Sequence, residues 1–245
     1  MRTIGALTRA AWLQARSYRL AMAMSVGGLV FSVVPTFFIA GALQPTMAES
    51  IASESEQYFA FMLVGAIAIM FVTAAISTLH GAVAGGISSG YFETLLMTRS
   101  SVPAVLIGLT SYGLLFTAVR AGVMLLAGWL LGAQVVWSQV VPALFILGLL
   151  VAAHWGIGLV AAALVIAFRT AGPLSQGVMV ISVLFGGVYY PTNVIPSWLG
   201  AISQVTPLAY GLRALRRVLL HGAGLGDVWS DVAVLVAIGA GLVLA

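Results

Sequence analysis

The chain has 245 residues, of which 62% are hydrophobic and only 7% charged, and its mean hydropathy is +1.13. A soluble domain of this size carries about 25% charged residues, so the composition excludes a soluble protein and predicts an all-α, polytopic membrane protein. All ten basic residues are arginine and there is no cysteine, which excludes a lysine-dependent nucleotide-binding loop, disulfides and thiolate metal sites.

Residues 1–19 have the pattern of an amphipathic helix. Arg2, Arg9 and Arg16 recur every seven residues, while apolar residues repeat at spacings of three and four. Trp12 and Tyr18 suit the headgroup layer of a bilayer. A signal peptide would need an apolar core and a small-residue cleavage site, which are missing. We therefore expect this helix to lie flat on the inner membrane surface.

Six later segments are apolar enough to cross a membrane, for which a helix needs about 20 residues. The expected spans are residues 20–43, 58–79, 102–131, 140–168, 174–190 and 228–245. The last two are the shortest. The sixth ends without a basic flank, so we expect the natural chain to continue beyond Ala245.

The arginines predict which side of the membrane each loop faces. With a cytoplasmic N-terminus, the outer segments 44–57 and 132–139 hold no arginine. Basic residues normally collect in cytoplasmic loops, so we expect a multi-pass protein of the cell membrane with its N-terminus inside. The same placement accounts for the net charge of +4 without nucleic acid, which we do not expect as a partner. The inner arginines are Arg2, Arg9, Arg16, Arg19, Arg99 and Arg169.

The segment 186–217 interrupts the hydrophobic sequence. It contains Pro191, Pro196 and Pro207, several aromatic residues and a final cluster of arginines. It is too broken for one spanning helix and too apolar for a solvated loop. We expect a re-entrant hairpin of short helices, because non-helical backbone is tolerated at membrane depth only where protein or water covers it.

The arginines of this segment are exceptions to the charge rule if the hairpin is on the outer side. Arg213, Arg216 and Arg217 then need acidic partners or lipid phosphates. The acidic residues nearest to them in sequence are Asp227 and Asp231.

The loop at residues 80–103 contains a second short amphipathic pattern. From residue 91 to residue 99, Phe92, Leu95, Leu96 and Arg99 follow helical spacing. On the cytoplasmic side such a helix fits a groove on a partner protein. The alternative is a connecting turn held at the membrane interface, and the spacing alone favours neither.

Three polar residues within the expected spans, Arg120, His154 and Gln176, are candidates for a functional role. Arg120 lies near the middle of the third span, where a charge costs at least about 2.5–3.5 kcal/mol and normally faces a partner or water. It either lines a substrate route or a dimer seam, or it extends its charge to the membrane surface (snorkelling) or binds a helix carbonyl. His154 in the fourth span either pairs with Arg120 or is simply hydrogen-bonded, and Gln176 has the same alternatives.

An enzymatic interpretation rests on the motif G-x-S-x-G at residues 86–90. Ser88 with His80 or His154 would make an intramembrane serine protease, although the motif normally needs a strand–turn–helix and an acidic partner. We expect no metal site, because the three histidines show no pair at the spacing i, i+4.

Two sequence segments resemble the ABC-2 type transporter permeases. Residues 90–99, GYFETLLMTR, resemble the family's segment G-x-x-E-x-L-L. Residues 186–217 resemble its proline-rich signature with P-x-W-L and P-L-x-Y before the final arginine. The order of elements is similar too, so the resemblance covers essentially the whole chain.

The resemblance implies export driven by ATP hydrolysis in a separate ABC ATPase subunit, usually with two permeases and two ATPases. ATP and Mg²⁺ would be bound by that subunit, and this chain would have no catalytic residue. Glu93 takes the place of the family's acidic coupling residue, although Pro103 comes later than the family's proline. The implied ATPase contact comprises Tyr91, Phe92, Glu93, Leu95, Leu96 and Arg99. The implied re-entrant gate comprises Pro191, Pro196, Trp198, Pro207, Tyr210 and Arg213.

Two further expectations concern what the protein moves. The apolar spans favour a hydrophobic drug or a lipid-like molecule over a polysaccharide. The alternative from another class is a membrane scaffold or assembly factor that transports nothing.

Overall fold

The computed structural model describes residues 2–90, 97, 101–168 and 172–244, which form helices joined by turns and short loops. Its first helices are α1 (Arg2–Ser17), α2 (Arg19–Ile51), α3 (Tyr58–Ser88), α5 (Val102–Leu130) and α6 (Val140–Phe168). Its later helices are α7 (Gly172–Phe185), α8 (Ser197–Val205), α9 (Pro207–His221) and α10 (Trp229–Leu244), with single turns η1 (Trp137–Gln139) and η2 (Thr192–Val194). None of the described residues forms a strand, in agreement with the all-α prediction.

Among the described residues, the four helices α2, α3, α5 and α6 are long and apolar enough to cross a membrane, and they correspond to the first four of the six expected spans. The other two expected spans are shorter. α7 has 14 residues and α10 has 16. At 1.5 Å per residue these helices reach about 21–24 Å, less than a hydrocarbon core of about 30 Å.

The boundaries of three expected spans differ from the structure. The span expected at 174–190 ends at Phe185, because Gly187 adopts φ +78°, a left-handed conformation that ends the helix. The spans expected at 20–43 and 58–79 continue to Ile51 and Ser88. α2 continues through Pro45 and α3 through Gly81, Gly85 and Gly86, so both helices run beyond the segments that hydropathy assigns to the membrane.

The helix α3 is the centre of the bundle. It packs against α2, α5, α6 and α9 and is buried along most of its length. Gly158 of α6 faces α3 so closely that an added Cβ would lie 2.8 Å from the carbonyl oxygen of Ala75. Close backbone approach of this kind holds helices together in lipid, where burying apolar side chains gives little net driving force.

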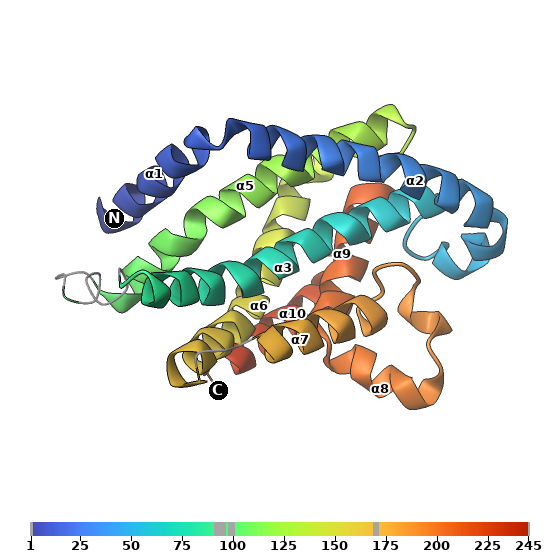
Figure 1. Ribbon diagram of the computed structural model, residues 1–245. Helices are drawn as coiled ribbons and strands as arrows, with labels where there is room; N and C mark the ends of the chain where they lie inside the picture. Colours follow the sequence, from blue (N-terminus) through green and yellow to red (C-terminus); the bar gives the residue numbers. More distant parts are fainter. Residues whose placement is uncertain (1, 91–96, 98–100, 169–171, 245) are drawn as a thin grey trace.

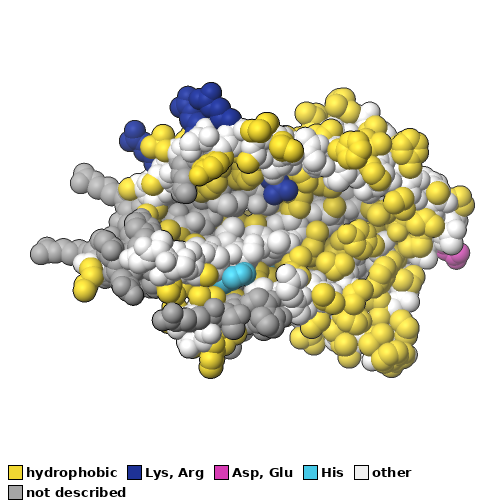
Figure 2. Space-filling view, in the orientation of Figure 1, with side chains coloured by type: hydrophobic (Ala, Val, Ile, Leu, Met, Phe, Trp, Pro, Cys, Tyr) yellow, Lys and Arg dark blue, Asp and Glu magenta, His cyan; other side chains and the backbone are white. Residues whose placement is uncertain are grey.

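The chain termini and the turns are divided between two ends of the bundle (Figure 1). Both termini, the end of α3 and the start of α5 lie at one end, which we call the α1 end. The loop after α2, the start of α3 and the whole of α8 lie at the opposite end, the α8 end. Figure 2 shows basic side chains over α1 and a broad hydrophobic surface over the other half.

The N-terminal helix α1 runs beside α5 and packs against it. Trp12 meets Tyr112 edge to face, with ring centroids 6.3 Å apart. Only Tyr18 separates α1 from α2. That α1 lies on the inner membrane surface remains a prediction.

Candidate functional site: the broken segment and its buried arginine

Residues 186–217, which we call the broken segment, fold as a turn, the η2 turn, α8 and the larger part of α9. A proline lies at each break between these elements. Pro191 and Pro196 have extended ψ angles of 149° and 140°, and Pro207 is the first residue of α9. A proline cannot donate to the preceding turn but suits the start of a helix, so each break follows from the sequence.

The predicted gate residues are spread over this segment. Pro191 and Pro207 are buried, whereas Pro196 and Trp198 are exposed. The Tyr210 hydroxyl donates to the carbonyl of Gln204 at 2.9 Å, which joins α9 to α8. The guanidinium of Arg213 stands 5.2 Å from the centre of the Tyr210 ring.

The arginines of α9 have different partners. Arg213 Nε lies 3.5 Å from an Asp231 carboxylate oxygen, so the prediction of an acidic partner is confirmed for this pair. Asp227 instead accepts a hydrogen bond from the Gly224 backbone at 2.9 Å within its own turn. Arg216, which we expected to need the same acidic residues, points elsewhere.

Arg216 is the most densely bonded side chain among the described residues, and only 1% of it is exposed. Its Nη1 donates to Glu54 Oε2 at 3.0 Å and to the Gly187 carbonyl at 2.9 Å. Its Nη2 donates to the carbonyls of Val188 at 2.9 Å and Phe61 at 3.1 Å, and Nε donates to Phe61 at 3.2 Å. All five guanidinium N–H groups are therefore used.

We call Arg216, Glu54, Phe61, Gly187 and Val188 the Arg216 hub. The guanidinium carbon also stands 3.3 Å from the centre of the Phe61 ring, a cation–π contact. An isolated charge would be strongly disfavoured in this apolar setting, but the Glu54 carboxylate and three carbonyls compensate it. Only an arginine presents five donors in a planar fork, so lysine could not reproduce the hub.

Two further hydrogen bonds attach the broken segment to the α2–α3 corner. The Tyr58 hydroxyl donates to the carbonyl of Tyr189 at 2.7 Å. The Asn193 side chain donates to the carbonyl of Ser50 at 3.2 Å. The segment is thus held by polar bonds at the α8 end rather than by apolar packing alone.

Because the backbone is closely packed at Gly65, the attachment of the broken segment to α3 is sensitive to the size of the side chain at this position. A Cβ at Gly65 would lie 2.3 Å from the Val188 carbonyl oxygen and 2.9 Å from Arg216 Nη2. We expect Gly65→Ala to lower the free energy of unfolding by about 1–3 kcal/mol, because the backbone must shift. Chemical unfolding of detergent-solubilised protein measures the change.

The matched control for this substitution is Gly81→Ala on the same helix. An added Cβ there meets nothing within 4 Å. We expect it to be neutral or to stabilise by up to about 1 kcal/mol through helix propensity. Equal destabilisation by both substitutions would contradict close packing at Gly65.

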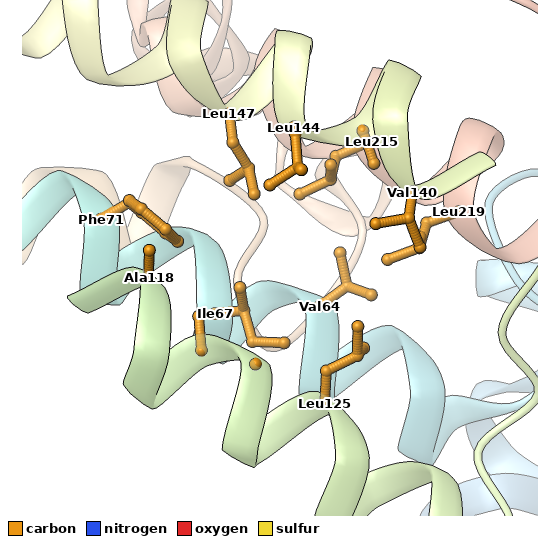
Figure 3. A pocket seen from close by; sticks show the side chains of 13 residues that line it. Val64, Ile67, Phe71, Ala118, Leu125, Val140, Leu144, Leu147, Leu215 and Leu219 are labelled. Carbon is orange, nitrogen blue, oxygen red and sulfur yellow. The ribbon is translucent and has the colours of Figure 1, made fainter. Parts of the chain in front are cut away.

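Behind the hub lies an apolar cavity of about 140 Å³ between α3, α5, α6 and α9. Figure 3 shows Val64, Leu125, Leu144, Leu215 and Leu219 converging on it. No polar side chain belongs to its lining, so it accommodates an apolar group but no polar one. One face of α9 therefore lines this cavity, while the adjacent residue Arg216 binds the carbonyls of Gly187 and Val188 at the start of the broken segment.

The polar residues of the expected spans do not form one site in the described structure. Arg120 Nε has no hydrogen-bond partner among these residues, and its guanidinium stands 5.9 Å from the Phe116 ring centre. His154 is buried and its Nδ1 lies 2.8 Å from the Leu150 carbonyl of the same helix. Gln176 is exposed on α7. No hydrogen bond within the described part of the chain joins any two of the three.

The enzymatic alternative receives no geometric support. The Ser88 hydroxyl donates to the Gly85 carbonyl at 3.0 Å, and His80 Nδ1 lies 2.9 Å from the Ile76 carbonyl. Over residues 2–90, 97, 101–168 and 172–244, no three side chains group as metal ligands. The predicted ATPase contact, Tyr91, Phe92, Glu93, Leu95, Leu96 and Arg99, lies outside the described residues.

The family model described as ABC-2 type transporter matches residues 3–220. The chain belongs to the ABC-2 type transporter family. It is accordingly the permease subunit of an ABC transporter, a multi-pass membrane domain without an ATPase site of its own. Members of the family normally work with an ABC ATPase. The match includes the broken segment and the Arg216 hub. No curated protein matches this permease.

Sequence reasoning missed Arg216 and Glu54 as a pair, and it missed the role of Gly65. The two charged residues lie 162 positions apart. One feature of the sequence could have revealed the pair. Glu54 is an acidic residue in a segment expected on the same side of the membrane as the unpaired arginines.

Proposed function

We propose that this permease exports a hydrophobic, drug-like or lipid-like molecule, driven by ATP hydrolysis in a separate ABC ATPase subunit. The observation that carries the proposal is the position of α3. It begins beside the broken segment at the α8 end and ends at the α1 end, next to residues 89–101. A central helix that contacts α9 of the broken segment at one end and leads in the chain into residues 89–101 at the other is suited to transmit motion between the two regions.

The proposed orientation puts the α1 end in the cytoplasm and the α8 end outside. The basic side chains over α1 support this, since cytoplasmic segments are rich in arginine. The expected six spans then include α7 and α10 in addition to the four long helices. The broken segment becomes the outer re-entrant hairpin, in which Pro191, Pro196, Trp198, Pro207, Tyr210 and Arg213 form the gate.

In the proposed mechanism, ATP and Mg²⁺ bind only to the ATPase subunit. Closure of two ATPases pushes on the segment around Glu93. The movement passes along α3 to the Arg216 hub and displaces the broken segment. A route then opens between two permeases, and this chain contributes no catalytic residue.

The substrate route is proposed to run along the seam between the two permeases. Arg120 is its best-supported polar residue, because part of its guanidinium is buried without a partner. His154 and Gln176 are further candidates. The apolar lining of the core cavity supports a hydrophobic substrate, since few polar groups are available to replace the hydration of a sugar.

Reconstitution tests the proposed function. The permease is incorporated into inside-out vesicles with the ABC ATPase that we expect to be encoded beside it, and uptake of a fluorescent hydrophobic dye is followed. We expect uptake only with ATP and an active ATPase, and no ATP hydrolysis by the permease alone. Vesicles with an ATPase whose Walker A lysine is replaced are the control. A scaffold protein would give equal dye signals in both preparations, which would contradict the proposal.

A further inference from the structure

A groove of about 790 Å³ lies between α1, α2 and α5, apart from the broken segment and the core cavity. Its walls are almost entirely apolar and include Ala23 of α2 and Phe116 and Val119 of α5. Trp12 and Arg9 of α1 line it as well. The volume falls in the usual range of small-molecule sites, about 300–1,000 Å³.

Three arginines surround the α1 side of this groove. A neighbouring cavity of about 260 Å³ shares Trp12 with it and is lined by Arg16 and Arg19. Arg9, Arg16 and Arg19 are exposed, and none of them forms an ion pair within the described part of the chain. The site is therefore apolar along its length and positively charged at one side.

A second copy of this chain does not complement that charge. The acidic residues in the described structure belong to the far end of α2, the loop after it and the segment that starts α10. Two copies inserted in the same orientation would bring arginine-rich α1 ends together and leave these carboxylates at the α8 end. The residues concerned are Glu49, Glu54, Glu56, Asp227 and Asp231.

The occupant that fits both features has an anionic head and a long apolar tail. We propose that the groove binds an anionic phospholipid of the bilayer, with its phosphate on Arg9, Arg16 and Arg19 and an acyl chain along α5. Basic residues on an amphipathic helix attract anionic lipid headgroups, and Trp12 is suited to the boundary between headgroup and chain. This lipid is a resident ligand and is distinct from the transported molecule.

Quenching of Trp12 fluorescence tests the assignment. The full chain is reconstituted in vesicles containing brominated phosphatidylglycerol or brominated phosphatidylcholine, with no transport substrate present. The signal of Trp12 is obtained by subtracting that of Trp12→Phe, because the chain has six tryptophans. We expect half-maximal quenching at roughly tenfold less phosphatidylglycerol than phosphatidylcholine, owing to the combined charges.

Two pairs of variants distinguish the effect of the arginine charges from the effect of the groove's shape. Replacing Arg9, Arg16 and Arg19 together by glutamine should remove the preference, whereas replacing all three by lysine should keep most of it. Ala23→Phe narrows the groove and should reduce quenching by both lipids. Ala21→Phe should not, because two residues turn a helix by about 200° and residue 21 is not part of the lining.

Three results would overturn the proposal. Equal quenching by the two lipids in the native chain would exclude headgroup selection. A preference that survives the glutamine triple variant would exclude the three arginines. Trp12 signals insensitive to both lipids would mean that protein, such as a second copy, covers the groove.

Discussion

Arg216→Leu is expected to lower the free energy of unfolding by about 3–5 kcal/mol, the range for breaking a buried ion pair from one side. The substitution leaves the Glu54 carboxylate without its charged partner in a buried position. It also removes the donors for the carbonyls of Phe61, Gly187 and Val188. Leaving a buried donor or acceptor without its hydrogen-bond partner costs about 1–3 kcal/mol per group. Chemical unfolding in detergent measures the loss.

The next residue provides the matched control. Arg217 is only half-buried, and the described residues show no salt bridge from it. We expect Arg217→Leu to change stability by no more than about 1 kcal/mol. Combining Arg216→Met with Glu54→Leu should recover part of the lost stability, because removing both buried charges is less destabilising than leaving one charge buried without its partner. If Arg216→Leu were no more harmful than Arg217→Leu, the hub would not hold the broken segment.

Glu93→Arg is expected to reduce ATP-driven transport by more than about tenfold, equivalent to over ~1.4 kcal/mol of lost coupling. The reason is the proposed contact with the ATPase, in which reversing the charge replaces attraction by repulsion. The protein should still insert and unfold like the native chain, since Glu93 does not belong to the Arg216 hub. Dye uptake by inside-out vesicles, normalised to the amount of inserted permease, measures the effect.

A second charge reversal distinguishes coupling from a general effect of charge. Glu49→Arg changes the same kind of residue at an exposed position near the end of α2. We expect it to leave transport within about twofold of the native rate, because it lies away from the proposed ATPase contact. Transport that survives Glu93→Arg would remove Glu93 from the coupling role.

The two proposals fail independently of one another. Loss of ATP-driven uptake in reconstitution would reject the export function but would leave the Trp12 quenching result unaffected. Equal quenching by both lipids would reject the phospholipid site without bearing on the ATPase. The stability of the Arg216 hub can be measured in either case, because unfolding needs no partner protein.

Local patterns were sufficient to predict most of the helices and the breaks between them. The run of apolar residues predicts α2, α3, α5 and α6, since a bilayer-spanning helix must be both long and apolar. Pro196 and Pro207 predict where α8 and α9 begin, because proline acts on its own backbone and the preceding turn. The family resemblance rests on the same local segments.

Pairing between distant residues was beyond prediction from the sequence. Asp231 was found as the partner of Arg213 because both lie close in the chain. Glu54 was not found as the partner of Arg216, and neither was the contact of Gly65 with Val188. Helical periodicity states which face a residue occupies but not which other helix meets that face.

The sequence by itself therefore determined the membrane class, the helical elements and the absence of a lysine-dependent nucleotide site. Each of these follows from composition or from interactions within a few residues. Only the tertiary structure decided that Arg216 is bonded at all five donors and that α1 and α5 border an arginine-rimmed groove. Such features depend on how the helices pack against one another. Within a membrane, helix packing is determined by close backbone contacts and buried hydrogen bonds rather than by the pattern of apolar residues.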